Sequence, residues 1–320
     1  MSIEFDRTAA GEGVEISLRL ETGRAYFEWR FHYTGQPRRE RLSIRLKDAR
    51  QETVMECLGL AAEEEALQSV LLQPRLWDGS REPYLYTLEA ALWDDEGVCL
   101  DWWHRQLPLY SLERKGGRGV FLNGAPCVLK TVRYEQPENM AETEQRALLE
   151  EDLSRLRMLG ANSVFVERKK RLKSLLEVCE RRGILVLTDA SFLSCGTEED
   201  DFDEIPVLRG GQVGTAPALL GADGQPTSEF YRYRAKWSGE PFVYLVPESV
   251  KRQKNGTFCA TVYSNCHRIA LYSDGALFEF QKGQGEFYFR EIPAKGPCVV
   301  LSVEGDGCGE AFSVHKALTK

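Results

Sequence analysis

Five charged residues follow short apolar runs in the middle of the chain. Arg133 and Glu135 come after one run, Glu167 and Arg168 come after a second, and Asp189 comes after a third. If the runs are parallel strands, these side chains lie at the carboxyl ends of the strands, where α/β architectures place their chemistry. The group is then either a polar site for a small ligand or a set of salt bridges that satisfy each other. Both interpretations stay open, and neither assigns a catalytic residue.

Two adjacent tryptophans form a second group of interest. Trp102 and Trp103 point to opposite faces if they lie on a strand. One of them can then stack on the apolar face of a sugar ring. In the other interpretation, one packs in a core and the other lies at a domain contact. Trp77 and Trp237 are predicted to be packing residues, and no role is predicted for His104, which follows the pair.

No metal or cofactor site is predicted. The four histidines are scattered along the chain, so their spacing does not suggest a metal site. The nine cysteines are odd in number, contain no Cys-x-x-Cys pair and lie mostly in apolar runs. We therefore expect free thiols throughout and a cytoplasmic protein.

The composition argues against several classes of protein. Of the 320 residues, 42% are hydrophobic and 28% are charged, so the chain can bury real cores. The net charge of -8 argues against a surface for nucleic acid or for anionic membranes. No stretch approaches the ~18 apolar residues of a membrane span. The first seven residues lack a basic head and an apolar run, so no secretion signal is expected.

Hydrophobic periodicity divides the chain into three predicted domains. Residues 1–112 alternate between apolar and polar positions, which predicts a small antiparallel sandwich. Residues 113–228 begin with a β-α-β-α-β pattern, which predicts a parallel sheet, and continue from residue 193 as a long acidic loop. Residues 229–320 alternate again and predict a second sandwich.

Local signals mark some of the element ends. Gly160 and Gly183 are predicted to end two amphipathic helices, because glycine tolerates the left-handed conformation found after a helix. Asn123 and Gly124 predict a tight type I′ hairpin turn. The segment Cys57–Leu72 fits either a helix or a strand.

Three stretches of the chain share a pattern with a known family. Residues 76–88 read LWDGSREPYLYTL, residues 121–130 read FLNGAPCVLK, and residues 231–247 read YRYRAKWSGEPFVYLVP, followed by VYSNC at 262–266. They are similar to the LWSPExPYLYTL, FxLNGKPVxLRG and YYxKxxWxxEPxVHLxP…VYSN patterns of glycoside hydrolase family 2. The chain thus resembles the β-galactosidases and β-glucuronidases.

This resemblance implies a multidomain fold that combines β and α/β parts. Two immunoglobulin-like β-sandwiches, at 1–112 and 229–320, would flank an incomplete (β/α) unit derived from a TIM barrel at 113–228. Only about 115 residues separate the sandwiches, whereas a closed barrel needs about 200. The family's acid/base and nucleophilic glutamates have no counterpart after Asp189. Two of the family's substrate contacts, an arginine and a histidine, are replaced by Phe165 and Arg168.

Two functions follow from the resemblance and its departures. The first is a non-catalytic protein with a binding or assembly role in carbohydrate metabolism. The second is an active β-glycosidase, acting on β-galactosides or β-glucuronides through atypically placed carboxylates such as Glu135 and Asp189. Carbohydrate is the expected partner in both. The strand Ile184–Leu187 would leave a free apolar edge, which predicts a homodimer through the incomplete unit or a cover formed by residues 193–225.

Overall fold

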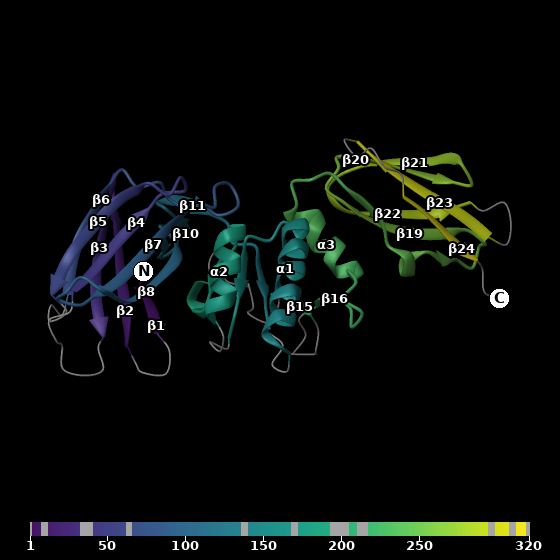
Figure 1. The fold of residues 1–320 in the computed structure, drawn as a ribbon. Helices are drawn as coiled ribbons and strands as arrows, with labels where there is room; N and C mark the ends of the chain where they lie inside the picture. The colour runs from purple at the N-terminus through teal and green to yellow at the C-terminus, as the bar shows by residue number, and fades with distance from the viewer. Residues whose placement is uncertain are drawn as a thin grey trace. The chain divides into compact units, whose positions relative to one another are not determined.

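The protein is mostly β, with several antiparallel sheets and one parallel sheet with helices (Figure 1). The computed structural model describes residues 2–7, 12–32, 41–61, 66–135, 140–167, 172–192, 205–209, 217–293, 298–306 and 312–317. Its contacts group into two compact units. The first joins Met1–Leu129 to Lys170–Glu198, and the second joins Lys130–Lys169 to Glu199–Lys320. The division into domains at residues 112 and 228 stays a prediction.

The first unit contains two four-stranded antiparallel sheets, ordered β1-β2-β3-β6 and β5-β4-β7-β8. Both sheets contribute to one buried core, so they form a sandwich. The segment Cys57–Leu72, which fitted a helix or a strand, belongs to strands on either side of residues outside the described part. The strands are β1 (Ser2–Arg7), β2 (Glu12–Glu21), β3 (Arg24–His32), β4 (Arg41–Lys47), β5 (Thr53–Ala61), β6 (Ala66–Leu72), β7 (Leu85–Trp93) and β8 (Cys99–Pro108).

Period-two alternation explains this core. Phe27 and Trp29 on β3 are buried and stack with ring centroids 5.2 Å apart, whereas Glu28 between them faces away from the core. The buried indole N–H of Trp29 donates a 2.8 Å hydrogen bond to Ser69 Oγ on β6. The polar atom of the largest core side chain therefore keeps a partner.

A smaller three-stranded sheet follows the sandwich, with strands β9 (Leu112–Lys115), β10 (Gly119–Leu122) and β11 (Ala125–Cys127) in the order β11-β10-β9. The predicted turn joins β10 to β11, where Asn123 and Gly124 have φ angles of 52° and 79°. Positive φ at both positions is what a type I′ turn requires, so the turn prediction is confirmed. The first unit also contains α2 (Leu172–Arg182), β14 (Leu185–Leu187) and the 3₁₀ helix η2 (Ala190–Phe192).

The apolar strand Ile184–Leu187, which was predicted to need a cover, is buried. Ile184, Leu185 and Leu187 are all buried, and Leu185 packs in a cluster with Trp77 and Leu122. Apolar side chains from the end of the sandwich and from the small sheet supply this cover within the first unit. The homodimer through the incomplete unit stays a prediction.

The second unit opens with parallel strands β12 (Thr131–Arg133) and β13 (Ser163–Phe165), joined by helix α1 (Glu142–Leu159). Two further strands, β15 (Val207–Arg209) and β16 (Ala218–Leu220), continue the parallel order as β13-β12-β15-β16. The prediction of one long loop over residues 193–228 is therefore wrong for these two strands. Their side chains are largely buried, and three-residue strands are too short to show a hydrophobic period.

The end of α1 lies where it was predicted. Gly160 follows the helix with φ 85°, and its N–H bonds to the last turn. A Cβ on Gly160 would lie 2.5 Å from the backbone oxygen of Trp237. Glycine is thus required twice at this position, by the left-handed conformation and by the closely approaching backbone.

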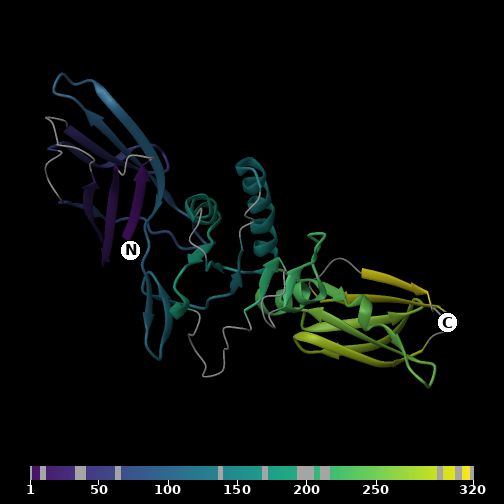
Figure 2. The same ribbon diagram turned by 90° about the horizontal axis from the view of Figure 1, so that it is seen from below.

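The second unit continues with helix α3 (Ser228–Trp237) and a second sandwich, which lie side by side in Figures 1 and 2. This helix occupies residues 229–237 of the segment in which a sandwich was predicted. Thr227 accepts a hydrogen bond from the N–H of Phe230 and begins this helix. The strands are β17 (Val243–Leu245), β18 (Lys251–Arg252), β19 (Phe258–Ser264), β20 (Arg268–Ser273), β21 (Ala276–Lys282), β22 (Gly285–Ile292), β23 (Cys298–Gly305) and β24 (Phe312–Ala317), with the 3₁₀ helix η4 (Pro247–Ser249) between β17 and β18.

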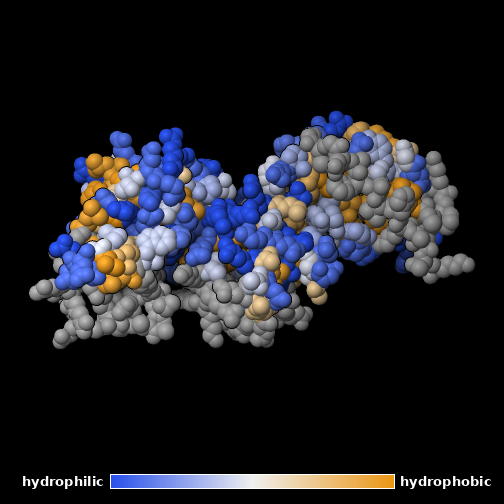
Figure 3. Space-filling view, in the orientation of Figure 1, coloured by the Kyte–Doolittle hydropathy of each residue, from blue (hydrophilic) through white to orange (hydrophobic). Residues whose placement is uncertain are grey.

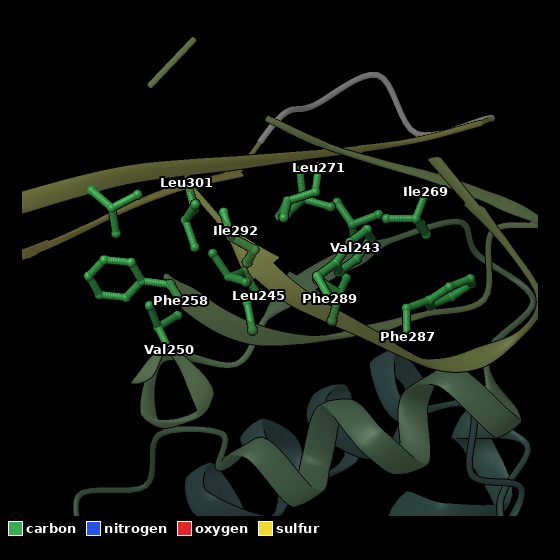
Figure 4. Close-up of a cluster of buried hydrophobic side chains, with 14 of the residues drawn as sticks. Val243, Leu245, Val250, Phe258, Ile269, Leu271, Phe287, Phe289, Ile292 and Leu301 are labelled. Atoms are coloured by element: carbon green, nitrogen blue, oxygen red, sulfur yellow. The ribbon is translucent and has the colours of Figure 1, made fainter. Parts of the chain in front are cut away.

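Two antiparallel sheets enclose the core of this second sandwich. One has the order β17-β19-β18 with β22 also paired to β19, and the other has the order β21-β20-β23-β24. Figure 4 shows side chains from both sheets pointing toward one another, among them Phe258, Leu271 and Phe289. Along β22, the buried Phe287 and Phe289 alternate with exposed side chains on the outer face.

The six cysteines whose side chains are described are free thiols. None of the helices in the described part of the chain combines the length and the apolar character that a membrane crossing requires. On the visible face of the first unit in Figure 3, hydrophilic side chains predominate and the hydrophobic ones form small separate groups.

Candidate functional site

The carboxyl ends of β12 and β13 bring together two of the predicted charged residues. Nε of Arg133 lies 3.6 Å from Oε1 of Glu167. The Arg133 side chain is only 4% exposed, whereas that of Glu167 is 52% exposed. A buried guanidinium thus meets a carboxylate that solvent reaches. The pair matches the salt-bridge interpretation of the sequence, and it also offers a polar surface to a ligand.

The register of the two strands explains why these residues meet. Thr131 on β12 lies opposite Ser163 on β13, and their hydroxyl oxygens are 2.7 Å apart. Arg133 is then opposite Phe165, and Glu167 follows two residues beyond the end of β13. The parallel register therefore sets the distance between the arginine and the glutamate.

A second ion pair lies near the same ends of the sheet and was not predicted. Arg209, the last residue of β15, donates to Asp152 on α1 through Nε at 2.9 Å and Nη2 at 2.6 Å. The hydroxyl of Tyr134 lies 3.4 Å from the other oxygen of Asp152. Asp152 is fully buried, and burial raises the pKa of its carboxyl while the Arg209 guanidinium opposes that rise.

A sequence signal for Asp152 did exist. Asp152 lies three residues after Leu149 and four before Leu156, so it belongs to the buried stripe of α1. An acidic residue in such a stripe needs a basic partner. That partner, Arg209, comes from the segment predicted as a loop, so its strand position was not visible in the sequence.

The other predicted strand-end residues are not brought into this pair of contacts. Glu135 is exposed, just beyond β12. Asp189 belongs to the first unit, where it is exposed and accepts a 2.8 Å hydrogen bond from the N–H of Ser191 at the start of η2. Arg168 lies outside the described residues.

The tryptophan pair behaves as strand geometry requires. Trp103 packs against the core of the first sandwich, whereas Trp102 is 52% exposed, so the two point to opposite faces of β8. Trp77 is completely buried and Trp237 is half-buried, which agrees with their predicted packing roles. The stacking of a sugar on this pair can therefore involve Trp102 but not Trp103.

A buried ion pair in the first unit was also missed by the sequence interpretation. Nη2 of Arg105 on β8 lies 3.7 Å from Oε2 of Glu180 on α2, and both side chains are less than a tenth exposed. Burial raises the pKa of Glu180 to about 7, although the Arg105 guanidinium acts in the opposite direction. The same burial, together with Glu180, holds the pKa of Tyr110 well above its usual value. The pair is enclosed and therefore structural.

An open cavity of about 430 Å³ lies between α3 and the start of β22. Two basic side chains one helical turn apart, Arg232 and Lys236, line it together with Ala235, Gln284, Gly285 and Glu286. Across the described ranges, no group of three or more His, Cys, Asp and Glu side chains is arranged to hold a metal ion.

Comparison with known proteins gives a consistent picture at the level of fold and distant sequence similarity. No protein-family model matches the chain. A β-glucuronidase from Bacteroides fragilis is 25% identical over 137 residues, which are 42% of this chain and 20% of that protein. A β-galactosidase from Bacteroides ovatus is 28% identical over 125 residues, 38% of this chain and 14% of that protein.

Similar solved structures extend the likeness over nearly the whole chain. An FMN-binding β-glucuronidase from Faecalibacterium prausnitzii L2-6 has a TM-score of 0.78 at 13% identity. The alignment covers 98% of this chain and 75% of the chain of that enzyme. A Bacteroides uniformis β-glucuronidase bound covalently to cyclophellitol-6-carboxylate aziridine has a TM-score of 0.72 at 14% identity, covering 98% of this chain and 62% of its own. The chain therefore shares its fold with part of these enzymes, and it matches a fifth or less of the length of the two sequence relatives.

Proposed function

We propose a function from the premise that this chain is β-glucuronidase- and β-galactosidase-like and related to glycoside hydrolase family 2. The proposal is a non-catalytic protein with a binding or assembly role in carbohydrate metabolism. Its sandwiches would be immunoglobulin-like, and its parallel sheet would derive from an incomplete TIM barrel.

The observation that carries the proposal is the pairing of carboxylates with arginines. A retaining glycosidase needs two carboxyl groups about 5–5.5 Å apart, one protonated and one ionised. Near the carboxyl ends of the parallel strands, Asp152 gives both of its oxygens to Arg209, and Glu167 lies beside Arg133. Each of these acids thus has a cation as its neighbour, which suits a structural role in neutralising that arginine better than proton transfer.

The number of strands gives independent support. A closed barrel of this kind has eight parallel strands, each followed by a helix. Between β11 and β17, the described residues contain β12, β13, β14, β15 and β16. The catalytic groups of a barrel come from the ends of several different strands, so a shorter set of strands supplies fewer positions for them.

A direct test measures turnover of aryl β-glucuronides and aryl β-galactosides by the purified chain. A second test incubates the chain with cyclophellitol-6-carboxylate aziridine and measures intact mass, with the Bacteroides uniformis enzyme as the positive control. We expect neither turnover nor a covalent adduct.

The alternative is an active β-glycosidase that uses unusual carboxylates. It is favoured by the kinship with enzymes and by the exposure of Glu135 and Asp189. Turnover that is abolished by Glu135→Gln or Asp189→Asn, but kept by Glu177→Gln on the exposed side of α2, would establish this alternative and refute the non-catalytic proposal.

A further inference from the structure

The outer face of the sheet β5-β4-β7-β8 in the first unit has an unusual composition. Leu42, Ile44 and Leu46 point into the core, so Ser43 and Arg45 point outward from β4. On β8, the core position of Trp103 sends Trp102 and His104 to the same outer face. This outer face therefore combines an aromatic pair at the edge strand with charged and polar side chains on the inner strands.

Trp102 is held in place but accessible. Its ring centroid lies 4.9 Å from that of His104, with 33° between the ring planes. Across the strands it faces Ala91, whose side chain is too small to cover an indole. The neighbouring Trp93 turns toward β4, where its Nε1 donates a 2.8 Å hydrogen bond to Ser43. One broad indole thus remains half-exposed beside an imidazole.

A row of polar side chains runs across the sheet next to these rings. Glu89 on β7 lies opposite His104 on one side and opposite Arg45 on the other. Glu89 also binds Lys47 at 2.7 Å, and Arg45 binds Glu56 on β5. These groups are already paired, and they remain partly open to solvent.

A second polar row lies beyond the first. Gln106 on β8 donates a 3.0 Å hydrogen bond to Thr87 on β7, and Gln51 reaches the same hydroxyl at 3.3 Å. Amide and hydroxyl groups thus flank the aromatic pair on the side away from Trp93. Such groups both donate and accept hydrogen bonds.

We propose that this outer face binds a saccharide, with one sugar ring stacked on Trp102. The apolar C–H side of the ring covers the indole, and its hydroxyl groups exchange hydrogen bonds with Glu89, His104 and Gln106. A sugar has an apolar C–H side and hydroxyl groups at its rim. These two kinds of surface match the aromatic pair and the two rows of polar side chains on this face.

Charge argues against a protein partner on this face. A dry protein contact would remove the Lys47–Glu89 and Arg45–Glu56 pairs from water, and the loss of hydration would outweigh much of the gain. A sugar replaces that water with hydroxyl groups, so the ion pairs keep their hydrogen bonds. The choice of a sugar as ligand takes from the proposed function only the relation to carbohydrate-active enzymes. The binding proposal holds whether or not the chain hydrolyses a glycoside.

Binding is tested by the retardation of the full chain in native gels that contain xylan, galactan, mixed-linkage β-glucan or polygalacturonate. At least one polysaccharide should retard the wild type. Trp102→Ala should weaken that binding by about tenfold or more, since stacking on one aromatic ring accounts for that much. The matched control is Tyr288→Ala on β22, which removes an aromatic ring that is 56% exposed, and it should bind like the wild type.

Three results would overturn the proposal. Wild-type protein that none of the four polysaccharides retards has no such site for them, and a Trp102→Ala variant that binds like the wild type places the site elsewhere. A wild-type dimer that Trp102→Ala converts to a monomer would make the face a contact between copies. Hydrolysis of aryl glycosides together with Trp102-dependent retardation would refute the non-catalytic function and leave this site supported.

Discussion

The indole Nε1 of Trp77 donates a 2.8 Å hydrogen bond to the backbone oxygen of Glu180, 103 residues further along the chain. Glu180 lies in the last turn of α2, where its carbonyl also accepts a longer hydrogen bond, of 3.3 Å, from the N–H of Gly183. A residue from the loop before β7 therefore completes the end of a helix in the same unit. The side chain of Glu180 meets Arg105 at the same place.

Replacing Trp77 by phenylalanine should destabilise the first unit by about 1–3 kcal/mol, because the Glu180 carbonyl loses the shorter of its two hydrogen bonds and the core loses volume. The measurement is urea-induced unfolding followed by circular dichroism. Trp93→Phe is the matched control, since Trp93 is only partly buried and its indole N–H serves a side-chain hydroxyl instead of a backbone carbonyl. Equal losses for both variants would contradict the proposed role of the Glu180 carbonyl.

The raised pKa of Glu180 should make the stability of the first unit depend on pH. Its pKa is about 7 in the folded protein, above the ordinary value of 4.5, so the folded state binds the extra proton. Stability attributable to this group is therefore present below about pH 4.5 and is lost as the pH rises to 7. Unfolding free energies measured from pH 4.5 to 8 should fall less steeply for Glu180→Gln than for the wild type. Glu177→Gln, on the exposed side of the same helix, should keep the wild-type slope.

Removing the carboxylate of Asp152 should be costly. Asp152→Asn leaves Arg209 without its bidentate partner and should lower the unfolding free energy by about 2–4 kcal/mol. Glu151→Gln, at the preceding position of the same helix, removes an exposed partner of Arg155 and should change little. A double variant with Arg209→Met should recover part of the loss. If that variant recovers nothing, the unpaired guanidinium is not the cause.

The two roles of Gly160 can be separated by a comparison of glycines. Gly256, in the turn between β18 and β19, has φ 86° and open space where a Cβ would lie, whereas Gly160 has φ 85° and the backbone of Trp237 within 2.6 Å of that position. Gly256→Ala should cost about 1 kcal/mol through its conformation alone. Gly160→Ala should cost clearly more, as judged by thermal unfolding. Similar losses would mean that the backbone near Trp237 moves aside easily.

Thiol titration tests the redox prediction. Under denaturing conditions without reductant, about nine thiols should react, because the described cysteines are free and the count is odd. A cytoplasmic location stays a prediction that this result would support. Two or more missing thiols in a fresh preparation would count against it.

Long elements, which contain several repeats of the hydrophobic period, could be predicted from the sequence. The shortest elements could not. The stripe of α1 and its glycine end were predicted because eighteen residues give several helical turns of signal. The strands β15 and β16 have three residues each, and α3 alternates Tyr231 and Tyr233 like a strand although Thr227 marks a helix start. Their burial depends on tertiary neighbours.

The candidate site divides in the same way. Arg133 and Glu167 were predicted together because parallel strands align their carboxyl ends. The pairing of Asp152 with Arg209 joins residues 57 positions apart through a strand that the sequence did not reveal. Strand geometry also predicted that Trp102 and Trp103 diverge, but not which of them faces the core.

The path of the chain between the two units has a consequence for synthesis. The first unit receives α2 and β14 only after β12, α1 and β13 have been made for the second unit. On a ribosome, the partner of Trp77 and Arg105, Glu180, is made only after β12, α1 and β13, so the first unit cannot mature before these elements of the second unit have emerged. For the same reason, a fragment that ends at Leu129 would lack part of its own core, and a protease cut between the units would have to occur at more than one place to release either of them.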